Sequence, residues 1–259
     1  MKRKGLFITI EGPEGAGKST QAAMLTEWLL HMGVAAVATR EPGEGKIGGQ
    51  IRSVILNPEN TEMSDRAEAF LYAADRAQHV EKMVKPALSE GAVVVCDRYV
   101  DSHLAYQGYG RGLNIDFLRQ LNEMATGGLM PDLTILLQLD AETGLERVKL
   151  RSRYAKGVDS ADSNDSEIDR IEQEKIDFHH RLCQGYAELA AAEPNRIKPV
   201  DANRDINAVK YEIRQIVSGL LLVRGLINST NLKEIFDDEL SDMTGNNKQK
   251  PESRQYQWE

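Results

Sequence analysis

A glycine-rich loop near the N-terminus constrains the fold of this chain more than any other segment. The loop follows the G-x-x-x-x-G-K-S pattern and runs through Gly12-Pro13-Glu14-Gly15-Ala16-Gly17-Lys18-Ser19. It is preceded by residues 6–10, an apolar run typical of a strand. It is followed by residues 20–31, in which Met24, Leu25, Trp28 and Leu29 fall on one face of a helix. Strand, loop and helix in this order predict a phosphate-binding βα unit.

The chemistry of the loop explains these residue types at this spacing. Glycines let the backbone turn inward so that its N–H groups face phosphate oxygens, and the start of the helix adds partial positive charge. Lys18 can bridge the outer phosphates of a nucleoside triphosphate, and the Ser19 hydroxyl can join the ligand shell of Mg²⁺. The alternative, a glycine turn that only links strand to helix, is disfavoured by the flanking elements.

Composition limits the partners of the chain. It has 259 residues, of which 41% are hydrophobic, and a net charge of −8. That suffices for one large domain or two small ones. Without a long Lys/Arg block, a nucleic-acid polymer is not an expected partner. No apolar stretch is long enough to cross a membrane, and the start MKRKG leads into a strand rather than a signal peptide. The two cysteines, Cys96 and Cys183, suggest no metal site or disulfide framework, so a cytoplasmic location is expected.

Helical and strand patterns alternate along the rest of the chain. Further strands are predicted over residues 34–39, 92–96, 133–139 and 197–200. Helices are predicted to end near residue 56, to include a long one inside 65–88, and to cover 114–124, 141–151, 169–191 and 205–222. The buried face of the long helix is expected to carry Ala67, Phe70, Leu71, Ala74, Val80 and Val84. Such alternation predicts a parallel sheet with helices on both faces.

Two segments are expected to lie outside the packed core. Residues 154–166 are almost free of apolar side chains and predict a mobile loop. From residue 226 onward the chain becomes polar and acidic. We therefore expect one domain over residues 1–225 and an acidic tail over 226–259, disordered or partly helical.

Charged residues end two of the predicted strands. Asp97, Arg98 and Tyr99 follow the third strand. Because ligands collect at the carboxyl ends of parallel strands, these side chains should face the phosphate loop. There a carboxylate can hold Mg²⁺ and an arginine can grip phosphate, and the alternative is an internal salt bridge. Arg40 and Glu41 end the second strand and either orient a second substrate or form a surface turn.

Two further pairs are candidates for nucleotide contacts. Tyr72 and Arg76 stand four residues apart and share one helix face, where they could stack and hydrogen-bond a base; core packing is the alternative. Arg151 and Arg153 precede the polar loop. Hinged on a mobile segment, they could neutralise charge on transferring phosphates, although the end of a helix also attracts cations.

Together these segments resemble the thymidylate kinase family, in the bacterial type that carries its catalytic arginine in a lid. The resemblance runs from about residue 6 to residue 222 and rests, in order, on GPEGAGKST, REPG, YAADRAQH, a strand ending in DRY, DSHLAYQGYGRG and DRIEQE. It implies a P-loop nucleoside monophosphate kinase-like α/β fold with a doubly wound parallel sheet, and a homodimer. The implied reaction transfers a phosphoryl group from ATP to dTMP with Mg²⁺, in dTTP biosynthesis.

On the ATP side, the resemblance assigns the phosphates to the loop and its flanks, which are Gly12, Pro13, Glu14, Gly15, Ala16, Gly17, Lys18, Ser19 and Thr20. Mg²⁺ is expected near Ser19, Glu11 and Asp97, and Glu11 and Glu14 resemble positions that touch the metal or the sugar. Gly15 stands where the other type of the family carries an arginine, so the lid, about residues 151–170, must supply that charge. Arg153 is the first candidate and Arg151 the second.

On the acceptor side, the residues that the resemblance assigns are Glu11, Arg40, Glu41, Arg52, Tyr72, Arg76, Asp97, Arg98, His103, Tyr106 and Gln107. Arg98 and Arg40 hold the monophosphate in this assignment, with Arg52 as a further candidate, and Arg98 also serves catalysis together with Lys18. The ring at 72 stacks on thymine, and the side chains at 76 and 107 bond its edges. The ring at 106 packs on the deoxyribose, where a 2′-hydroxyl would clash.

The chain departs from the family pattern at three places, one of which is the stretch 154–168, longer than in most relatives. EPGEG replaces the commoner E-P-G-G-T and puts Glu44 and Lys46 near the acceptor site. His103 stands where relatives often have a small polar residue, and it either adds a base contact or packs. Two other functions stay open: a kinase for another nucleoside monophosphate, and a nucleotide-dependent switch. Guanine-reading switches need Asn-Lys-x-Asp, and the chain has only Asn247-Lys248 followed by Gln249.

Overall fold

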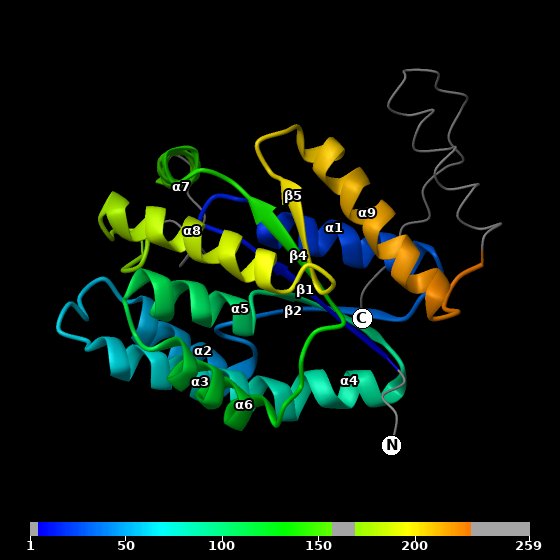
Figure 1. Cartoon of the computed structure of the whole chain (residues 1–259), viewed down its shortest axis with the longest axis horizontal. Coiled ribbons are helices and arrows are strands. Elements are labelled where there is room, and N and C mark those ends of the chain that lie inside the picture. Colours follow the sequence, from blue (N-terminus) through cyan, green and yellow to red (C-terminus); the bar gives the residue numbers. More distant parts are fainter. Residues whose placement is uncertain (1–4, 157–168, 229–259) are drawn as a thin grey trace. The chain divides into compact units, whose positions relative to one another are not determined.

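The computed structural model describes residues 5–156 and 169–228, with only the backbone for residues 155 and 156. Figure 1 gives the element labels. The chain divides into two compact units inside helix α9, between Arg214 and Gln215. Most of the polar loop at 154–166 and most of the tail at 226–259 lie outside the described residues, so the predicted domain limits stay predictions.

Five parallel strands form the centre of the first unit. They are β1 (Leu6–Glu11), β2 (Ala36–Arg40), β3 (Val93–Asp97), β4 (Leu133–Gln138) and β5 (Ile197–Asp201), in the order β2-β3-β1-β4-β5. β1 pairs with β3 on one side and β4 on the other, so the loop after β1 emerges at the middle of the sheet, where the strand order reverses. The predicted doubly wound fold is confirmed, and each strand lies within two residues of its predicted limits.

Helices connect the strands. They are α1 (Lys18–His31), α2 (Gly45–Leu56), α3 (Asp65–His79), α4 (Lys85–Glu90), α5 (Val100–His103), α6 (Ile115–Thr126), α7 (Ala141–Lys156), α8 (Ile176–Ala192) and α9 (Ile206–Val223). Two π-helical segments, η1 (Val80–Val84) and η2 (Leu104–Gly110), follow α3 and α5. Asn114 caps α6, as the sequence predicted, by accepting the Phe117 N–H at 2.8 Å. Within residues 5–156 and 169–228, a membrane-spanning helix is not found.

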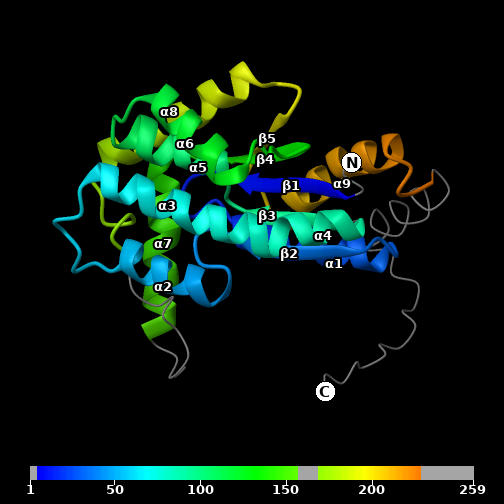
Figure 2. The ribbon, with the colours of Figure 1, turned by 90° about the horizontal axis from the view of Figure 1, so that it is seen from below.

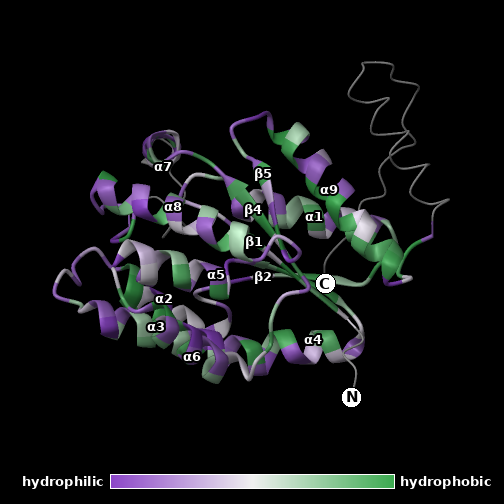
Figure 3. Ribbon diagram, viewed as in Figure 1, coloured by the Kyte–Doolittle hydropathy of each residue, from purple (hydrophilic) through white to green (hydrophobic). Residues whose placement is uncertain are grey.

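Apolar side chains cover both faces of the sheet. On one face, Phe7 and Val94 are packed with Val80 and Val84 of η1 and with Leu88 of α4. In Figure 1 the strands lie between α4 on this side and α1 on the other, and α8 packs on β4 and β5. Figure 2 shows α3 and α4 as one nearly continuous helical segment, and Figure 3 shows β1 and β4 as mostly hydrophobic, whereas β5 is mixed. This core fixes the strand ends that carry the site.

The predicted buried face of the long helix at 65–88 is wrong for its first half. Phe70 is 53% exposed and Ala67 and Ala74 are also exposed, whereas Val80 and Val84 are buried as expected. The buried side of α3 carries polar groups instead, including Asp75 and Arg76. Apolar periodicity failed here because the buried side of this helix mixes two small apolar residues, Ala69 and Ala73, with polar side chains that have partners elsewhere in the fold.

Three other boundaries differ from the predictions. Residues 100–110, for which no helix was predicted, form α5 and η2. α7 continues to Lys156, beyond the predicted end at 151. The helix predicted from residue 169 begins only at Ile176, because the backbone N–H of Arg170 is bonded to Leu56 O at 3.2 Å and its side chain to Ile55 O at 2.9 Å. These bonds hold residues 169–175 against the end of α2, in turns.

Candidate active site

The glycine-rich loop connects β1 to α1 through left-handed backbone at two glycines. Gly15 has φ 72° and Gly17, the N-cap of α1, has φ 87°, a region that other residues adopt only with strain. At Gly15 a Cβ would also lie 2.2 Å from Gly144 O of α7. Lys18 is buried beneath the loop and donates from Nζ to Pro13 O at 2.6 Å.

A cavity of about 1180 Å³ opens in front of this loop. This volume is larger than the roughly 300–1,000 Å³ typical of a pocket for one small molecule. The cavity is therefore large enough for two ligands. Most of the predicted site residues line it: Glu14, Gly15, Gly17, Lys18, Ser19, Thr20, Arg40, Glu41, Arg52, Tyr72, Arg76, Asp97, Arg98, His103, Tyr106, Gln107 and Arg151. The loop residues Gly12, Pro13 and Ala16 do not line it, and neither do Glu11 and Arg153.

Arg98 occupies the middle of the site and is fixed on several sides. Within the described part of the chain it is the non-glycine residue with positive φ, at 70°, a conformation that costs on the order of 1–2 kcal/mol. Its Nη2 donates to Glu14 Oε1 at 2.6 Å and its Nη1 to the Tyr106 hydroxyl at 2.8 Å. Burial alone would raise the pKa of Glu14, but Arg98 and Lys18 lower it to about 2. Glu14 is therefore a carboxylate at neutral pH.

A corner suited to a hard metal ion lies between α1 and β3. The Ser19 hydroxyl donates to Asp97 Oδ2, and Asp97 Oδ1 is buried with no hydrogen-bond partner among the described residues. A hydroxyl beside a carboxylate with one open oxygen matches the few protein ligands that Mg²⁺ takes when phosphates and water supply the rest. Among the described residues, no three His, Cys, Asp or Glu side chains are gathered as a metal cluster.

The lysine of the loop lies in the same cavity. Burial and then Arg98 lower the pKa of Lys18 to about 8.

Glu11 lies behind the cavity wall rather than in it. Its Oε1 accepts the Tyr99 N–H at 2.7 Å, and its Oε2 accepts the hydroxyls of Ser102 at 2.5 Å and Tyr186 at 3.1 Å. Burial, with a contribution from Asp101, raises its pKa to about 7. The structure thus does not bring Glu11 to the metal corner, since protein donors already occupy both of its oxygens.

The far end of the cavity is built from a buried hydrogen-bonded network. Arg76 donates from Nε to Glu41 Oε2 at 2.8 Å and from Nη1 to Asn122 Oδ1 at 2.7 Å. Glu41 also bonds His79 Nδ1 at 2.8 Å, and His103 Nδ1 lies 2.7 Å from Asn122 Oδ1. Burial and then Arg76 lower the pKa of His103 to about 3, so its ring is neutral.

Two side chains predicted to meet the base are held in this same region. The Tyr72 ring lies 6.3 Å from the His103 ring, between centroids. Gln107 Nε2 donates to Glu68 Oε1 at 2.9 Å. Glu68 is buried and also pairs with Arg111 and Arg170. These groups are therefore positioned before any ligand arrives.

The other wall of the cavity comes from α7 and the turn after the lid. Arg151 lines the cavity and donates from Nη2 to Glu172 Oε1 at 2.7 Å, whereas Arg153 lines a separate groove beside α7. Arg147, which the sequence reasoning missed, also lines the cavity and donates to Ala202 O at 3.1 Å. Its spacing of four from Arg151 was the available signal. Glu172 was also missed, although it closes a D-x-x-E pattern with Asp169.

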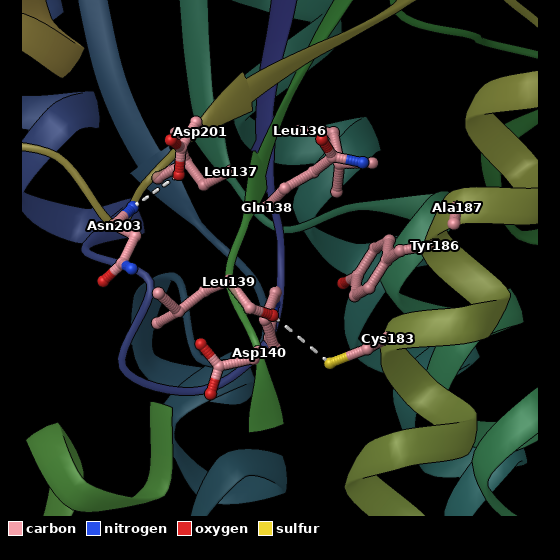
Figure 4. A pocket seen from close by; sticks show the side chains of 11 residues that line it. Leu136, Leu137, Gln138, Leu139, Asp140, Cys183, Tyr186, Ala187, Asp201 and Asn203 are labelled. Atoms are coloured by element: carbon pink, nitrogen blue, oxygen red, sulfur yellow. Dashed lines mark hydrogen bonds between the residues drawn. The ribbon is translucent and has the colours of Figure 1, made fainter. Parts of the chain in front are cut away.

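A smaller cavity of about 320 Å³ lies on the other side of the loop, between the ends of β4 and β5 and helix α8. Figure 4 shows the Cys183 thiol in it, donating to Leu139 O at 3.5 Å, and Asn203 N–H donating to Asp201 at 2.9 Å. Burial raises the pKa of Cys183 to about 11, so it is a thiol at neutral pH. Of the predicted site residues only Pro13 lines this cavity.

The strand order, the loop with its buried lysine, and a cavity with cationic groups on both sides of Arg98 define a P-loop kinase that acts on small phosphorylated substrates. The comparisons with known proteins narrow this class. A family model described as thymidylate kinase matches residues 10–213. The chain belongs to the thymidylate kinase family.

Individual relatives agree along most of the chain. Thymidylate kinase of Halothermothrix orenii is 48% identical over 219 residues, which cover 85% of this chain and 99% of the relative. That of Clostridium novyi is 44% identical over 211 residues, 82% of this chain and 97% of the relative. The crystal structure of thymidylate kinase from Ehrlichia chaffeensis has a TM-score of 0.64 at 29% identity and covers 83% of this chain and 98% of that one.

Proposed function

We propose that the protein transfers a phosphoryl group from ATP to dTMP, giving ADP and dTDP in the biosynthesis of dTTP. The observation that carries the proposal is the position of Arg98, between the loop residues Lys18 and Ser19 and the base-facing residues Tyr72 and Gln107, in one cavity. Family membership supports the choice of thymidylate over other acceptors. A kinase for another nucleoside monophosphate would use the same loop with different contacts at the far end.

The side chains suit this reaction without a protein nucleophile. An oxygen of the acceptor phosphate forms the new P–O bond while the bond to ADP breaks, so catalysis consists mainly of alignment and charge neutralisation. In the proposal the loop backbone and Lys18 hold the ATP phosphates. Arg98, with Arg40 and Arg52, holds the acceptor phosphate, and Arg151 neutralises the charge that develops between the two substrates.

Mg²⁺ is proposed as the cofactor, held by the Ser19 hydroxyl and by Asp97, directly or through water. The open Asp97 Oδ1 supports this assignment. When bound, the ion would neutralise charge on the ATP phosphates. The protein side chains then need only align the acceptor and keep water out.

The far end of the cavity supports recognition of a pyrimidine deoxynucleotide. In the proposal the Tyr72 ring stacks on the base, and Arg76, Gln107 and His103 contact its edges. The Tyr106 hydroxyl is fixed by Glu14 at 2.7 Å, so its ring cannot yield to a ribose 2′-hydroxyl without breaking that bond. This favours dTMP over ribonucleotides.

The test is acceptor-dependent ADP release with ATP and Mg²⁺, measured with dTMP, dUMP, UMP, CMP, AMP and GMP. Strong turnover with dTMP and little with UMP is the expected result. Turnover only with another acceptor would keep the phosphate loop and overturn the assignment of the base end. No acceptor-dependent turnover from folded protein would overturn the kinase and favour a nucleotide-dependent switch.

We also propose a cytoplasmic homodimer. Large apolar side chains are exposed on three neighbouring helices: Ile47 (50%) and Val54 (46%) on α2, Phe70 (53%) on α3, and Met124 (75%) on α6. Covering them with a second copy would remove apolar surface from water. Light scattering should give twice the chain mass, and Phe70→Glu should give the single mass; a monomeric wild type at micromolar concentration would overturn the dimer. The free cysteines suit a reducing compartment.

A further inference from the structure

The turn after the lid is fixed by a reciprocal pair of hydrogen bonds. Asp169 Oδ1 accepts the Glu172 N–H at 2.8 Å, and Glu172 Oε2 accepts the Asp169 N–H at 3.2 Å. This is the geometry of a capping box, in which each side chain satisfies the backbone of the other. The Glu172 side chain is only 3% exposed, so its carboxylate has one position.

The second oxygen of the same carboxylate faces α7. Glu172 Oε1 accepts Arg151 Nη2 at 2.7 Å, and both residues line the main cavity. A guanidinium carries several N–H donors in a rigid fork. One bond to a fixed carboxylate therefore restricts the direction of the fork and leaves further donors for a phosphate.

Within the described residues, the other two arginines of α7 are held differently. Arg147 donates to the main-chain oxygens Ala202 O at 3.1 Å and Gly15 O at 3.5 Å. Arg153 lines the groove on the other side of the helix. Among these three residues, Arg151 is the one that lines the cavity in an ion pair with a side-chain carboxylate.

Local charge favours this pairing. Burial raises the pKa of Glu172, with Asp169 as the next cause, and burial followed by Glu14 raises that of Asp169. These three carboxyl groups thus lie close enough to repel one another and any phosphate between them. Arg98 pairs with Glu14 and Arg151 pairs with Glu172, which offsets the repulsion.

We propose that Glu172 is a positioning residue, which holds Arg151 on the cavity wall so that its remaining donors meet the transferring phosphoryl group. The proposal rests on the phosphoryl-transfer function proposed above. It identifies Arg151, rather than Arg153, as the arginine of this wall that acts on the phosphates. Glu172 itself does not touch the substrates.

Glu172→Gln separates this role from a structural one, because glutamine also serves in a capping box and keeps the turn. Only the charge that orients Arg151 is removed. We expect kcat to fall by about 10-fold while KM for ATP and the thermal midpoint stay close to wild type, as for a group needed in the transition state. Arg151→Ala should lower kcat by about 100-fold, and adding Glu172→Gln to it should lower kcat no further.

Glu142→Gln is the matched control. It also removes the charge of a carboxylate with a side-chain partner, His180 Nε2 at 2.7 Å, but on the exposed first turn of α7, and it should leave kcat unchanged. If Glu172→Gln keeps the wild-type kcat, or lowers kcat equally with and without Arg151, the positioning role is wrong.

A second measurement does not depend on turnover. Modification of Arg151 by phenylglyoxal, followed by mass spectrometry with Arg153 as internal reference, should become several-fold faster in Glu172→Gln and stay unchanged in Glu142→Gln. Unchanged modification of Arg151 in Glu172→Gln would overturn the proposal. If instead the wild type shows this protection but no turnover with dTMP, the proposed reaction fails while the pairing stands.

Discussion

The two arginines on opposite walls of the cavity differ in how firmly they are held. Arg98, at the end of β3, has a side chain 17% exposed and bonds to Glu14 and Tyr106, whereas the side chain of Arg151 on α7 is 56% exposed and paired with Glu172. A group with several partners keeps one position for every ligand, and a group with one partner can adjust. The strand-end wall is therefore suited to binding the acceptor, and the α7 wall to meeting charge that appears only during transfer.

The largest expected effect is a loss of kcat at the phosphate loop, which lies next to the strand-end wall. Lys18→Ala should lower kcat by about 10³-fold, because a buried cation at the outer phosphates is lost. The fold should persist, since removing the side chain leaves the loop glycines unchanged. Steady-state kinetics together with circular dichroism measure both. Lys149→Ala, on the exposed side of α7, is the control, and wild-type turnover in Lys18→Ala would end the phosphate-loop assignment.

The next effect tests how rigid the far end is. Glu68 is buried and accepts hydrogen bonds from Gln107, Arg111 and Arg170. Glu68→Ala should lower the free energy of unfolding by about 3 kcal/mol, because it leaves the largely buried guanidinium groups of Arg111 and Arg170 without this carboxylate. Glu172→Ala removes one capping-box bond and a pair to the 56% exposed Arg151, so it should cost less, about 1–2 kcal/mol. Urea denaturation of both variants gives the comparison, and equal losses would contradict the expected difference in rigidity between the far end and the α7 wall.

A third test separates the lid arginines. Arg151→Ala should lower kcat by about 10²-fold with little change in KM, as expected for a contact made in the transition state. Arg153→Ala, two residues along the same helix but in the other groove, should stay within about twofold of wild type. If Arg153→Ala shows the loss and Arg151→Ala does not, the sequence's first candidate is right and the geometry misleads.

The smallest expected effect concerns the buried carboxyl behind the strand-end wall. Burial and Asp101 raise the pKa of Glu11 from 4.5 to about 7. Because the folded-state value lies above the unfolded one, wild-type stability falls as pH rises through this window. Glu11→Gln does not titrate there, so its stability relative to wild type should increase by on the order of 2 kcal/mol between pH 5 and pH 8.

Glu14 supplies a control, because its contribution to stability changes with pH in the opposite direction to that of Glu11. Its pKa is about 2 when folded, below its unfolded value, so its carboxylate stabilises the fold at neutral pH and this contribution disappears as pH falls toward 2. Glu14→Gln should therefore destabilise the protein at pH 7. Thermal denaturation across pH measures both variants. Parallel pH curves for wild type and Glu11→Gln would show that Glu11 is not titrating in this range.

The sequence predicted the parts of the molecule that carry local signals. The loop from Gly12 to Ser19 and the strand end at Asp97 and Arg98 are visible because a strand, a turn and charged residues stand next to one another in the chain. The strands were found for the same reason, since their apolar runs are short and bounded. Functional residues that are neighbours in the sequence can therefore be predicted from the sequence.

What could not be predicted depends on partners distant in the chain. Arg76 is buried because Glu41, just after β2, and Asn122, on α6, meet it, and no periodicity on α3 reveals that. Phe70 was expected inside for the converse reason, because apolar character alone does not say which helix face is covered. Arg151 gains its position from Glu172, across the polar loop. The roles of these site residues therefore depend on contacts between residues that are distant in the sequence, and only the three-dimensional structure shows such contacts.

The contact between Gly15 and Gly144 limits how this protein could evolve. A Cβ at Gly15 would lie 2.2 Å from Gly144 O, and one at Gly144 would lie 2.4 Å from Glu14 O. An arginine at position 15 would therefore clash with the backbone of α7 and displace this helix from the loop, together with Arg147 and Arg151. Moving the proposed catalytic cation from α7 into the loop therefore could not proceed by one substitution here, because α7 would have to be repositioned as well.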